Sequence, residues 1–205
     1  MSISALLLAA GGSRRFGEAK QLVDWGGRPL LRHVLEQVRS WPVDQVVVVL
    51  GHRVEEILDR VDLDDTTVVV NPEWETGLAS SLRVGLAALE RDPRAEAAII
   101  ALGDQPEVDP GVVRRLVEAY RRRGRWAVVP KYRYVRANPV LVDRALWTRL
   151  MSLRGDDGAR QLLQAHPEWV EEVWVDRLPP RDVDTPGDLA DLRPSIRGRR
   201  PPSGS

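Results

Sequence analysis

The chain has 205 residues, of which 43% are hydrophobic and 29% are charged. These proportions are typical of a globular protein, and the length suits a single α/β domain. Thirty basic residues balance thirty acidic residues, and there is no cysteine. The composition therefore gives no reason to expect a nucleic-acid partner. It also excludes disulfide bonds, thiolate metal sites and cysteine nucleophiles.

The first residues, Met-Ser-Ile-Ser, have no basic segment ahead of a short apolar run. This pattern predicts a core strand and not a signal peptide. No apolar run reaches the length of about 18 residues that a membrane-spanning helix needs. We therefore expect a cytoplasmic protein that does not associate with a membrane.

Six short runs rich in β-branched and other apolar residues predict strands. Several of them are apolar throughout, which is typical of strands covered on both faces. The six runs are residues 3–9, 45–50, 66–70, 97–102, 126–129 and 172–175.

Helical spacing of apolar residues predicts helices over residues 30–38, 78–89 and 146–153. Asp109-Pro110 and Thr185-Pro186-Gly187-Asp188 are typical of helix N-termini, with proline following the capping residue. Strands that alternate with helices predict a mostly parallel sheet, which binds its ligand at the carboxyl ends of the strands. We expect one domain over residues 1–192. Residues 193–205 are rich in Pro, Gly, Ser and Arg, and are expected to be disordered.

The loop after the first predicted strand is suited to a polyphosphate. Two adjacent glycines let backbone N–H groups turn toward an anion, and three cations follow closely. The spacing fits neither a P-loop, in which lysine follows the second glycine directly, nor the dinucleotide fingerprint Gly-x-Gly-x-x-Gly. The loop reads Ala9-Ala10-Gly11-Gly12-Ser13-Arg14-Arg15-Phe16-Gly17-Glu18-Ala19-Lys20.

Two acidic segments are candidates for a metal site. Asp104 directly follows a predicted buried strand in Gly103-Asp104-Gln105-Pro106, a position from which a carboxylate can hold Mg²⁺ beside phosphate oxygens. Asp182 and Asp184 lie on the same side of an extended segment because side chains alternate along it. An ordinary turn and a helix N-terminus would explain the same acids, so the residues alone leave these alternatives open.

These segments resemble the nucleotidyltransferases related to molybdenum cofactor cytidylyltransferase. Residues 7–22 match every fixed position of the loop pattern L-A-A-G-x-S-x-R-x-G-x-x-K. Residues 103–106 match the metal-binding motif G-D-x-P, and residues 182–186 match D-[IV]-D-T-P. The resemblance covers about residues 3–192.

Three further segments extend the resemblance. Residues 71–82 match N-P-x-W-x-x-G-x-x-x-S-L beside the nucleotide, and residues 155–160 match G-D-x-G-A-R near the acceptor. At residues 137–141 the family usually has Gly-His-Pro-Val, whereas this chain has Ala137 and Asn138. This departure leaves the identity of the acceptor open.

The resemblance implies a three-layer, Rossmann-like fold of the nucleotide-diphospho-sugar transferase type. It implies Mg²⁺-dependent transfer of CMP from CTP to a phosphate-bearing acceptor, with release of pyrophosphate. The best match for the acceptor is molybdopterin, and a molybdoenzyme that receives the product is a further possible partner.

The same resemblance assigns roles to individual residues. Catalysis is assigned to Arg15, Lys20 and Asp104, and Mg²⁺ to Asp104 and Asp184. The acceptor is assigned to Asn138, Gly158 and Arg160. The nucleotide is assigned to Ala9, Ala10, Gly11, Gly12, Ser13, Arg15, Lys20, Asn71, Gly77, Ser81 and Asp104.

The choice of base follows from one position. Cytidylyltransferases of this family carry Leu-Ala-Ala-Gly where guanylyltransferases usually carry Leu-Ala-Gly-Gly, so Ala10 favours CTP. A GTP-dependent molybdopterin guanylyltransferase and a sugar-phosphate cytidylyltransferase remain alternatives within the class. An NAD(P)-dependent oxidoreductase and a non-catalytic cofactor carrier are alternatives from other classes.

Overall fold

The computed structural model describes residues 2–12, 16–122 and 124–197. Within these ranges the strands form one sheet in the order β3-β2-β1-β4-β7-β5-β6, and β8 pairs with β5. The strands are β1 (Ser2–Ala9), β2 (Gln45–Leu50), β3 (Thr67–Val70), β4 (Ala95–Leu102), β5 (Ala127–Tyr132), β6 (Val135–Arg136), β7 (Val140–Asp143) and β8 (Val170–Val175).

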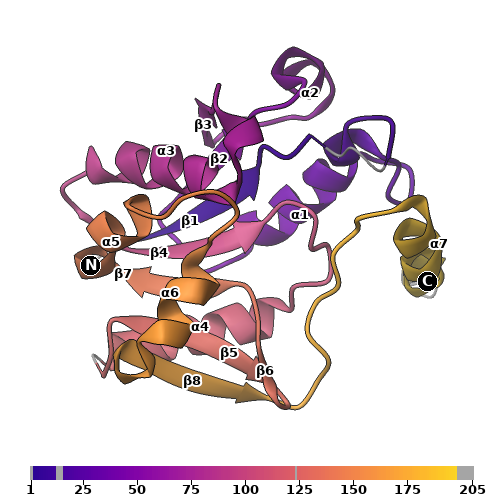
Figure 1. The fold of residues 1–205 in the computed structure, drawn as a ribbon. Coiled ribbons are helices and arrows are strands. Elements are labelled where there is room, and N and C mark those ends of the chain that lie inside the picture. The colour runs from indigo at the N-terminus through magenta and orange to yellow at the C-terminus, as the bar shows by residue number, and fades with distance from the viewer. Residues whose placement is uncertain (1, 13–15, 123, 198–205) are drawn as a thin grey trace.

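Helices cover both faces of this sheet (Figure 1). Alternate residues of β1 explain the layers: Leu7 packs with the residues of α1 and α4, whereas Leu6 packs with those of α3, α5 and α6. Both leucines are fully buried, as expected for a strand in the middle of three layers. The helices are α1 (Leu30–Arg39), α2 (Val54–Arg60), α3 (Leu78–Glu90), α4 (Pro110–Arg121), α5 (Trp147–Met151), α6 (Ala159–Ala165) and α7 (Pro186–Arg197).

The sheet is mostly parallel, as the sequence predicts. β1 pairs in parallel with β2 on one side and with β4 on the other, so the strand order reverses between β1 and β4. β7 runs antiparallel between β4 and β5, and β8 is again parallel to β5. The loops that leave the carboxyl ends of β1 and β4 therefore meet at the switch point, where open α/β sheets bind ligands.

All six predicted strands are present, with ends that differ by up to three residues. The antiparallel strands β6 and β7 and the helices α2 and α6 were not predicted. β7 has four residues and α2 has seven, so neither gives a periodic pattern long enough to recognise. β7 becomes a strand because Val140–Asp143 pairs with neighbours on both sides, which is a tertiary effect.

The C-terminal helix α7 extends beyond the expected domain boundary at residue 192. It continues to Arg197, and residues 198–205 of the expected disordered segment lie outside the described ranges. Thr185 Oγ1 accepts a hydrogen bond from the Asp188 N–H, and the Asp188 carboxylate accepts one from the Thr185 N–H. This capping box nucleates the helix, and each further residue then adds one hydrogen bond, so the helix extends into a segment of unfavourable composition.

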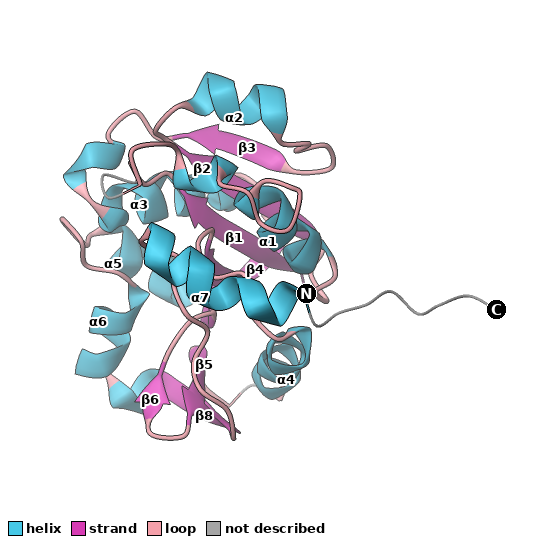
Figure 2. Ribbon diagram, turned by 90° about the vertical axis from the view of Figure 1, so that its right-hand side faces the viewer, coloured by secondary structure: helices cyan, strands magenta, loops and turns pink. Residues whose placement is uncertain are grey.

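α7 lies on the same side of the molecule as the arrowheads of β4 and β8, and Figure 2 shows it in front of the sheet. The loop that leads to α7 therefore reaches the end of the sheet where the glycine-rich loop begins. None of the helices in the described ranges is both long enough and apolar enough to span a lipid bilayer.

Candidate active site

A cleft of about 540 Å³ lies at the carboxyl ends of β1 and β4. Its walls come from the loop after β1, the start of α3, the end of β4 and the segment before α7. The lining residues are Leu8, Ala10, Gly11, Gly12, Lys20, Trp74, Glu75, Gly77, Leu78, Ser81, Leu102, Asp104, Asp156 and Asp184. Most of the residues predicted for the nucleotide thus surround one space, although they are far apart in the sequence.

Lys20 joins the two predicted metal ligands. Its Nζ donates to Asp104 Oδ2 at 2.7 Å and to Asp184 Oδ1 at 2.8 Å. Burial of the amine opposes its charge, but the charges and hydrogen bonds of Asp104 and Asp184 outweigh burial and raise the pKa of Lys20. The ammonium ion is therefore the stable form, and it neutralises part of the negative charge of the carboxylate pair.

Lysine at position 20 is unusual for this chain, in which almost all basic residues are arginines. Only two of the thirty basic residues of the chain are lysines, Lys20 and Lys131. A compact ammonium group fits between two carboxylates from different segments, whereas the planar guanidinium of arginine is larger and prefers a bidentate partner. The structure thus gives a steric reason for lysine in an arginine-rich chain.

The segment before α7 is held against the loop after β4. Val183 is fully buried, and its N–H donates to the Asp104 carbonyl oxygen at 2.9 Å. Asp182 and Asp184 flank this anchor and face two different partners. Asp184 accepts from Lys20, whereas Asp182 Oδ1 accepts from Gln105 Nε2 at 2.7 Å.

Asp182 lies on the exposed rim of this cluster. The protein around its carboxylate disfavours the charged form and raises the pKa of Asp182, an effect that the hydrogen bond from Gln105 opposes. The negative charges of Asp104 and Asp184 raise it further, and the charge of Lys20 acts in the other direction. Three carboxylates and one ammonium group therefore interact at this end of the sheet.

The carboxylate pair fits a hard divalent cation. Asp104 Oδ1 is buried and has no hydrogen-bond partner among the described residues, and Asp104 and Asp184 converge on one point, where the Lys20 ammonium now lies. In the part of the chain that the structure describes, no group of three or more acidic or histidine side chains is placed so that it could hold a metal ion. Mg²⁺ is usually bound by one or two protein carboxylates when substrate phosphates and water supply its other ligands, so this pair is sufficient.

The glycine-rich loop forms one wall of the cleft, and the Trp74 ring, which also lines the cleft, lies against Gly12. A Cβ atom on Gly12 would lie 2.4 Å from the Trp74 ring, so the close packing of the loop on the indole requires glycine there. Ala9 does not line the cleft; its carbonyl oxygen accepts from Gln21 Nε2 at 2.6 Å. Ser13 and Arg15, predicted to bind the nucleotide, lie outside the described residues.

The opposite wall is the start of α3. Gly77 has φ +109°, and a Cβ atom there would lie 2.3 Å from the backbone of Gly155. The Ala79 N–H donates to the Gly155 carbonyl oxygen at 2.9 Å. This close approach places Ser81 and Asp156 on the same cleft.

Asn71 takes a different position from the predicted one. Its side chain is 1% exposed, donates to Ser80 Oγ and Ser81 Oγ, and accepts from the Glu73 N–H. Asn71 is not among the residues that line the cleft. In this structure it joins the end of β3 to the first turn of α3, and so it positions Ser81.

The predicted acceptor residues divide between two places. Asn138 and Arg160 line a second cavity of about 340 Å³, which shares Leu102 with the cleft. Gly158 lines neither cavity. It precedes α6, its N–H donates to Gln161 Oε1, and a Cβ atom would lie 3.0 Å from Leu78. Gly158 therefore has a packing role here.

The cleft and the carboxylate pair agree with sequence comparison. The sequence profile of the MobA-like NTP transferase domain matches residues 5–170, which include β1, the glycine-rich loop and Asp104. The chain belongs to this family. It is a family of nucleotidyltransferases, which commonly use a divalent metal.

Similar proteins have been described under different names. The chain is 30% identical to a nicotine blue oxidoreductase of Paenarthrobacter nicotinovorans, covering 89% of this chain and 92% of that protein. It is 22% identical to the molybdenum cofactor cytidylyltransferase of Escherichia coli K12, covering 92% and 94%.

The solved structures confirm the predicted fold. The Rv0371c protein of Mycobacterium tuberculosis H37Rv superposes with a TM-score of 0.87 at 34% identity, covering 95% of this chain and 98% of that chain. A structure of Rv0371c in complex with manganese superposes with a TM-score of 0.83 at 32% identity, covering 95% and 100%. A mostly parallel sheet between helices is the nucleotide-diphospho-sugar transferase arrangement that the sequence predicts.

Several lining residues were not predicted. Trp74 and Asp156 lie within the two segments that resemble the family, and a closer inspection of those segments could have indicated them. Glu75 occupies a variable position of its segment, so no sequence signal distinguishes it. The contact between Gln105 and Asp182 depends on the buried anchor at Val183, which only the fold reveals.

Proposed function

We propose that this chain transfers CMP from CTP to a phosphate on a molybdopterin-type acceptor and releases pyrophosphate. The observation that carries the proposal is the position of Lys20. Its ammonium group bridges Asp104 and Asp184 beside the glycine-rich loop, at the switch point of the sheet. Charge neutralisation beside a backbone-lined pocket is what a triphosphate requires.

The chemistry needs positioning and not a general base. An oxygen of the acceptor phosphate attacks the α-phosphorus of CTP, a new P–O bond forms, and the bond to the departing pyrophosphate breaks. The attacking oxygen is already anionic, so the protein has to bring two anions together and hold them in line. Lys20 reduces their repulsion by contributing a positive charge next to the phosphates.

A divalent cation on Asp104 and Asp184 would supply charge neutralisation for the α-phosphate and the attacking phosphate. The support for this assignment is the buried, unpartnered Asp104 Oδ1 and the convergence of the two carboxylates. The manganese complex of Rv0371c gives further support, because that chain is 32% identical to this one. Asp104 and Asp184 would hold the cation, and Lys20 beside them would contribute its own positive charge to the phosphates.

CTP is favoured over GTP by Ala10, which is 4% exposed and lines the cleft. A methyl group there leaves less room than glycine, which suits a pyrimidine better than a purine. The molybdopterin-type acceptor is favoured by the similarity to the Escherichia coli cytidylyltransferase over almost the whole chain.

The test is a screen of the four NTPs with Mg²⁺ and molybdopterin, in which pyrophosphate release is measured. We expect release with CTP, and far less with the other nucleotides. No release with any NTP would refute the transfer reaction, and a preference for GTP would refute the CTP assignment.

A second candidate is an NAD(P)H-dependent oxidoreductase. It is favoured by the 30% identity to the nicotine blue oxidoreductase, which extends over 92% of that protein. The test is an assay of NADH or NADPH oxidation with a quinone-like dye as the electron acceptor. The reaction is measured by the loss of absorbance of the reduced nicotinamide. If the transfer proposal is correct, this assay shows no turnover, whereas pyrophosphate release depends on Asp104.

A further inference from the structure

The second cavity, next to the cleft, has two kinds of wall. Most of its lining is apolar, including Leu102, Val129, Val140 and Leu163. Apolar walls favour the face of a ring over a polyol, which would leave its hydroxyl groups without partners. The polar lining residues are Gln105, Arg136, Asn138, Arg160 and Asp182, and Gln105 is hydrogen-bonded to Asp182.

The orientation of the Gln105 amide follows from its neighbour. Gln105 is 5% exposed, and its Nε2 donates to Asp182 Oδ1 at 2.7 Å. A carboxylate only accepts hydrogen bonds, so the amide has to present its NH₂ group to Asp182. Gln105 Oε1 consequently faces away, and it is buried with no hydrogen-bond partner among the described residues.

A buried acceptor without a partner is costly, and a ligand that donates to it recovers that cost. Asp182 lies beside it on the exposed rim, where a ligand can reach its carboxylate. The two side chains together offer an amide oxygen and a carboxylate that both accept hydrogen bonds. The complementary group is an edge with adjacent N–H donors, such as an amino group next to a ring N–H.

We propose that Gln105 and Asp182 determine acceptor specificity by accepting hydrogen bonds from the N–H edge of a flat heterocycle. This inference rests on the proposed function, since it places the acceptor in the cavity beside the nucleotide cleft. According to this inference, Gln105 and Asp182 are the two side chains that let the protein distinguish an aminated ring from a sugar phosphate. The plain alternative is that Gln105 only ties the loop after β4 to the segment before α7.

The test compares two isosteric ligands, pterin and lumazine, which differ in a 2-amino group replaced by an oxo group. Their binding is measured by ring fluorescence without nucleotide or metal. We expect wild-type protein to bind pterin at least ~10-fold more tightly than lumazine. Where pterin presents an amino group that donates, lumazine presents a carbonyl oxygen, which cannot donate to the two acceptors. In the D182N variant an amide oxygen still accepts from Gln105, but an NH₂ group replaces one acceptor. The preference for pterin should then disappear.

The matched control is D176N, the same change at a largely exposed carboxylate that pairs loosely with Arg133 at 3.7 Å. It should keep the preference for pterin. Equal affinity of wild-type protein for both rings, absence of pterin binding, or a preference that survives in D182N would overturn the inference. A protein that binds pterin with this preference but releases no pyrophosphate from any NTP would refute the proposed function alone.

Discussion

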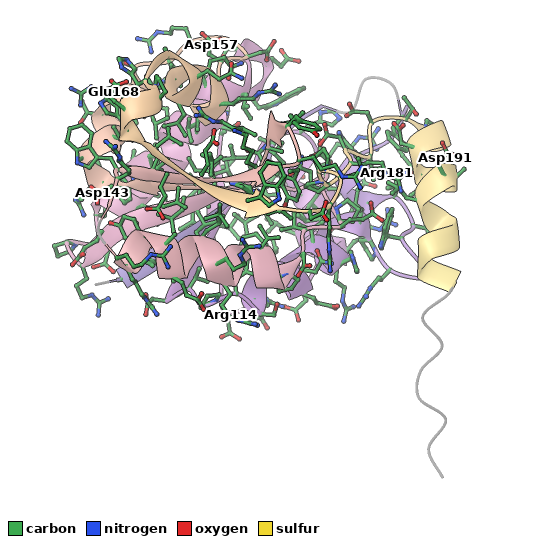
Figure 3. All side chains as sticks on the ribbon, turned by 90° about the horizontal axis from the view of Figure 1, so that it is seen from below. Arg114, Asp143, Asp157, Glu168, Arg181 and Asp191 are labelled. Atoms are coloured by element: carbon green, nitrogen blue, oxygen red, sulfur yellow. The ribbon has the colours of Figure 1, made fainter. Side chains whose placement is uncertain are left out.

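Two cavities of similar volume lie at opposite ends of the central sheet. The cleft at the carboxyl ends of β1 and β4 measures about 540 Å³, and a cavity at the amino ends of β4, β5 and β8 measures about 600 Å³. Figure 3 shows Asp143 and Glu168 at one end of the molecule and Arg181 and Asp191 at the other. The amino-end cavity is lined by Glu96, Tyr120, Gly124, Arg125, Trp126, Asp143, Glu168 and Trp169.

The two cavities differ in how their charged groups are satisfied. At the amino end, Asp143 accepts from the Tyr120 hydroxyl at 2.6 Å and from the Ala145 N–H at 2.8 Å, so both of its oxygens have structural partners. In the cleft, one buried oxygen of Asp104 has no partner among the described residues, and its other oxygen accepts a hydrogen bond from Lys20 Nζ. Volume therefore does not distinguish the two cavities, whereas the unpartnered oxygen of Asp104 does.

The largest expected effect on the transfer rate comes from removing a carboxylate from the cleft, compared with removing one from the amino-end cavity. Asp104→Ala should reduce the transfer rate by at least ~10²-fold, the scale of losing one main electrostatic contact. It should leave the fold intact, because Asp104 lies on a loop. Glu168→Ala, which removes a 58%-exposed carboxylate at the amino end, should change the rate little. Steady-state kinetics at saturating Mg²⁺ and thermal unfolding measure both, and near-normal turnover of Asp104→Ala would contradict the metal assignment.

The two lysines of the chain give the next comparison. Lys20→Arg should lower kcat/KM for CTP by about 10²-fold, because a guanidinium does not fit between two carboxylates in the same way. Lys131 pairs with Glu172 at 2.6 Å on the neighbouring part of the sheet, and Lys131→Arg should keep that pair and normal kinetics. Similar values for the two variants would show that the charge of Lys20, and not its shape, is sufficient.

Two glycines with positive φ test how tightly the cleft wall is built. Gly77 lies against the Gly155 backbone, whereas Gly27, with φ +90°, has open space where its Cβ would be. Gly77→Ala should lower the free energy of unfolding by about 2 kcal/mol more than Gly27→Ala, since overpacking adds to backbone strain. Urea denaturation measures the difference. Equal losses would mean that the contact between α3 and Gly155 adjusts without cost.

The smallest expected effect is on the preference for cytosine over guanine in the nucleotide substrate. Ala10→Gly should move the ratio of kcat/KM for CTP and GTP toward GTP by about 10-fold, because one methyl group in a pocket discriminates weakly. Hydrogen bonds to the base edge would still favour cytosine, so no complete switch is expected. An unchanged ratio would remove Ala10 as the cause of a CTP preference without affecting the preference itself.

Local signals were sufficient for much of the fold. The run Gln45–Leu50 was predicted with the ends that the structure shows, because a continuous β-branched run between turns has few other stable states. The cap at Asp109 was predicted for the same kind of reason: its side chain accepts from the Gly111 N–H within one turn of chain. β7 was missed because its strand conformation depends on two neighbours that are distant in sequence.

The sequence by itself determined the α/β class. It also determined that the glycine-rich loop, Asp104 and Asp184 match the motifs of a family, because such motifs depend on residue types at short spacing. Only the tertiary structure decided that Lys20 bridges the two carboxylates, that Asn71 faces inward and that Gln105 meets Asp182. These contacts join residues up to 164 positions apart. Such contacts form only when strand order and buried anchors such as Val183 bring distant loops to the same end of the sheet, and no local pattern encodes that geometry.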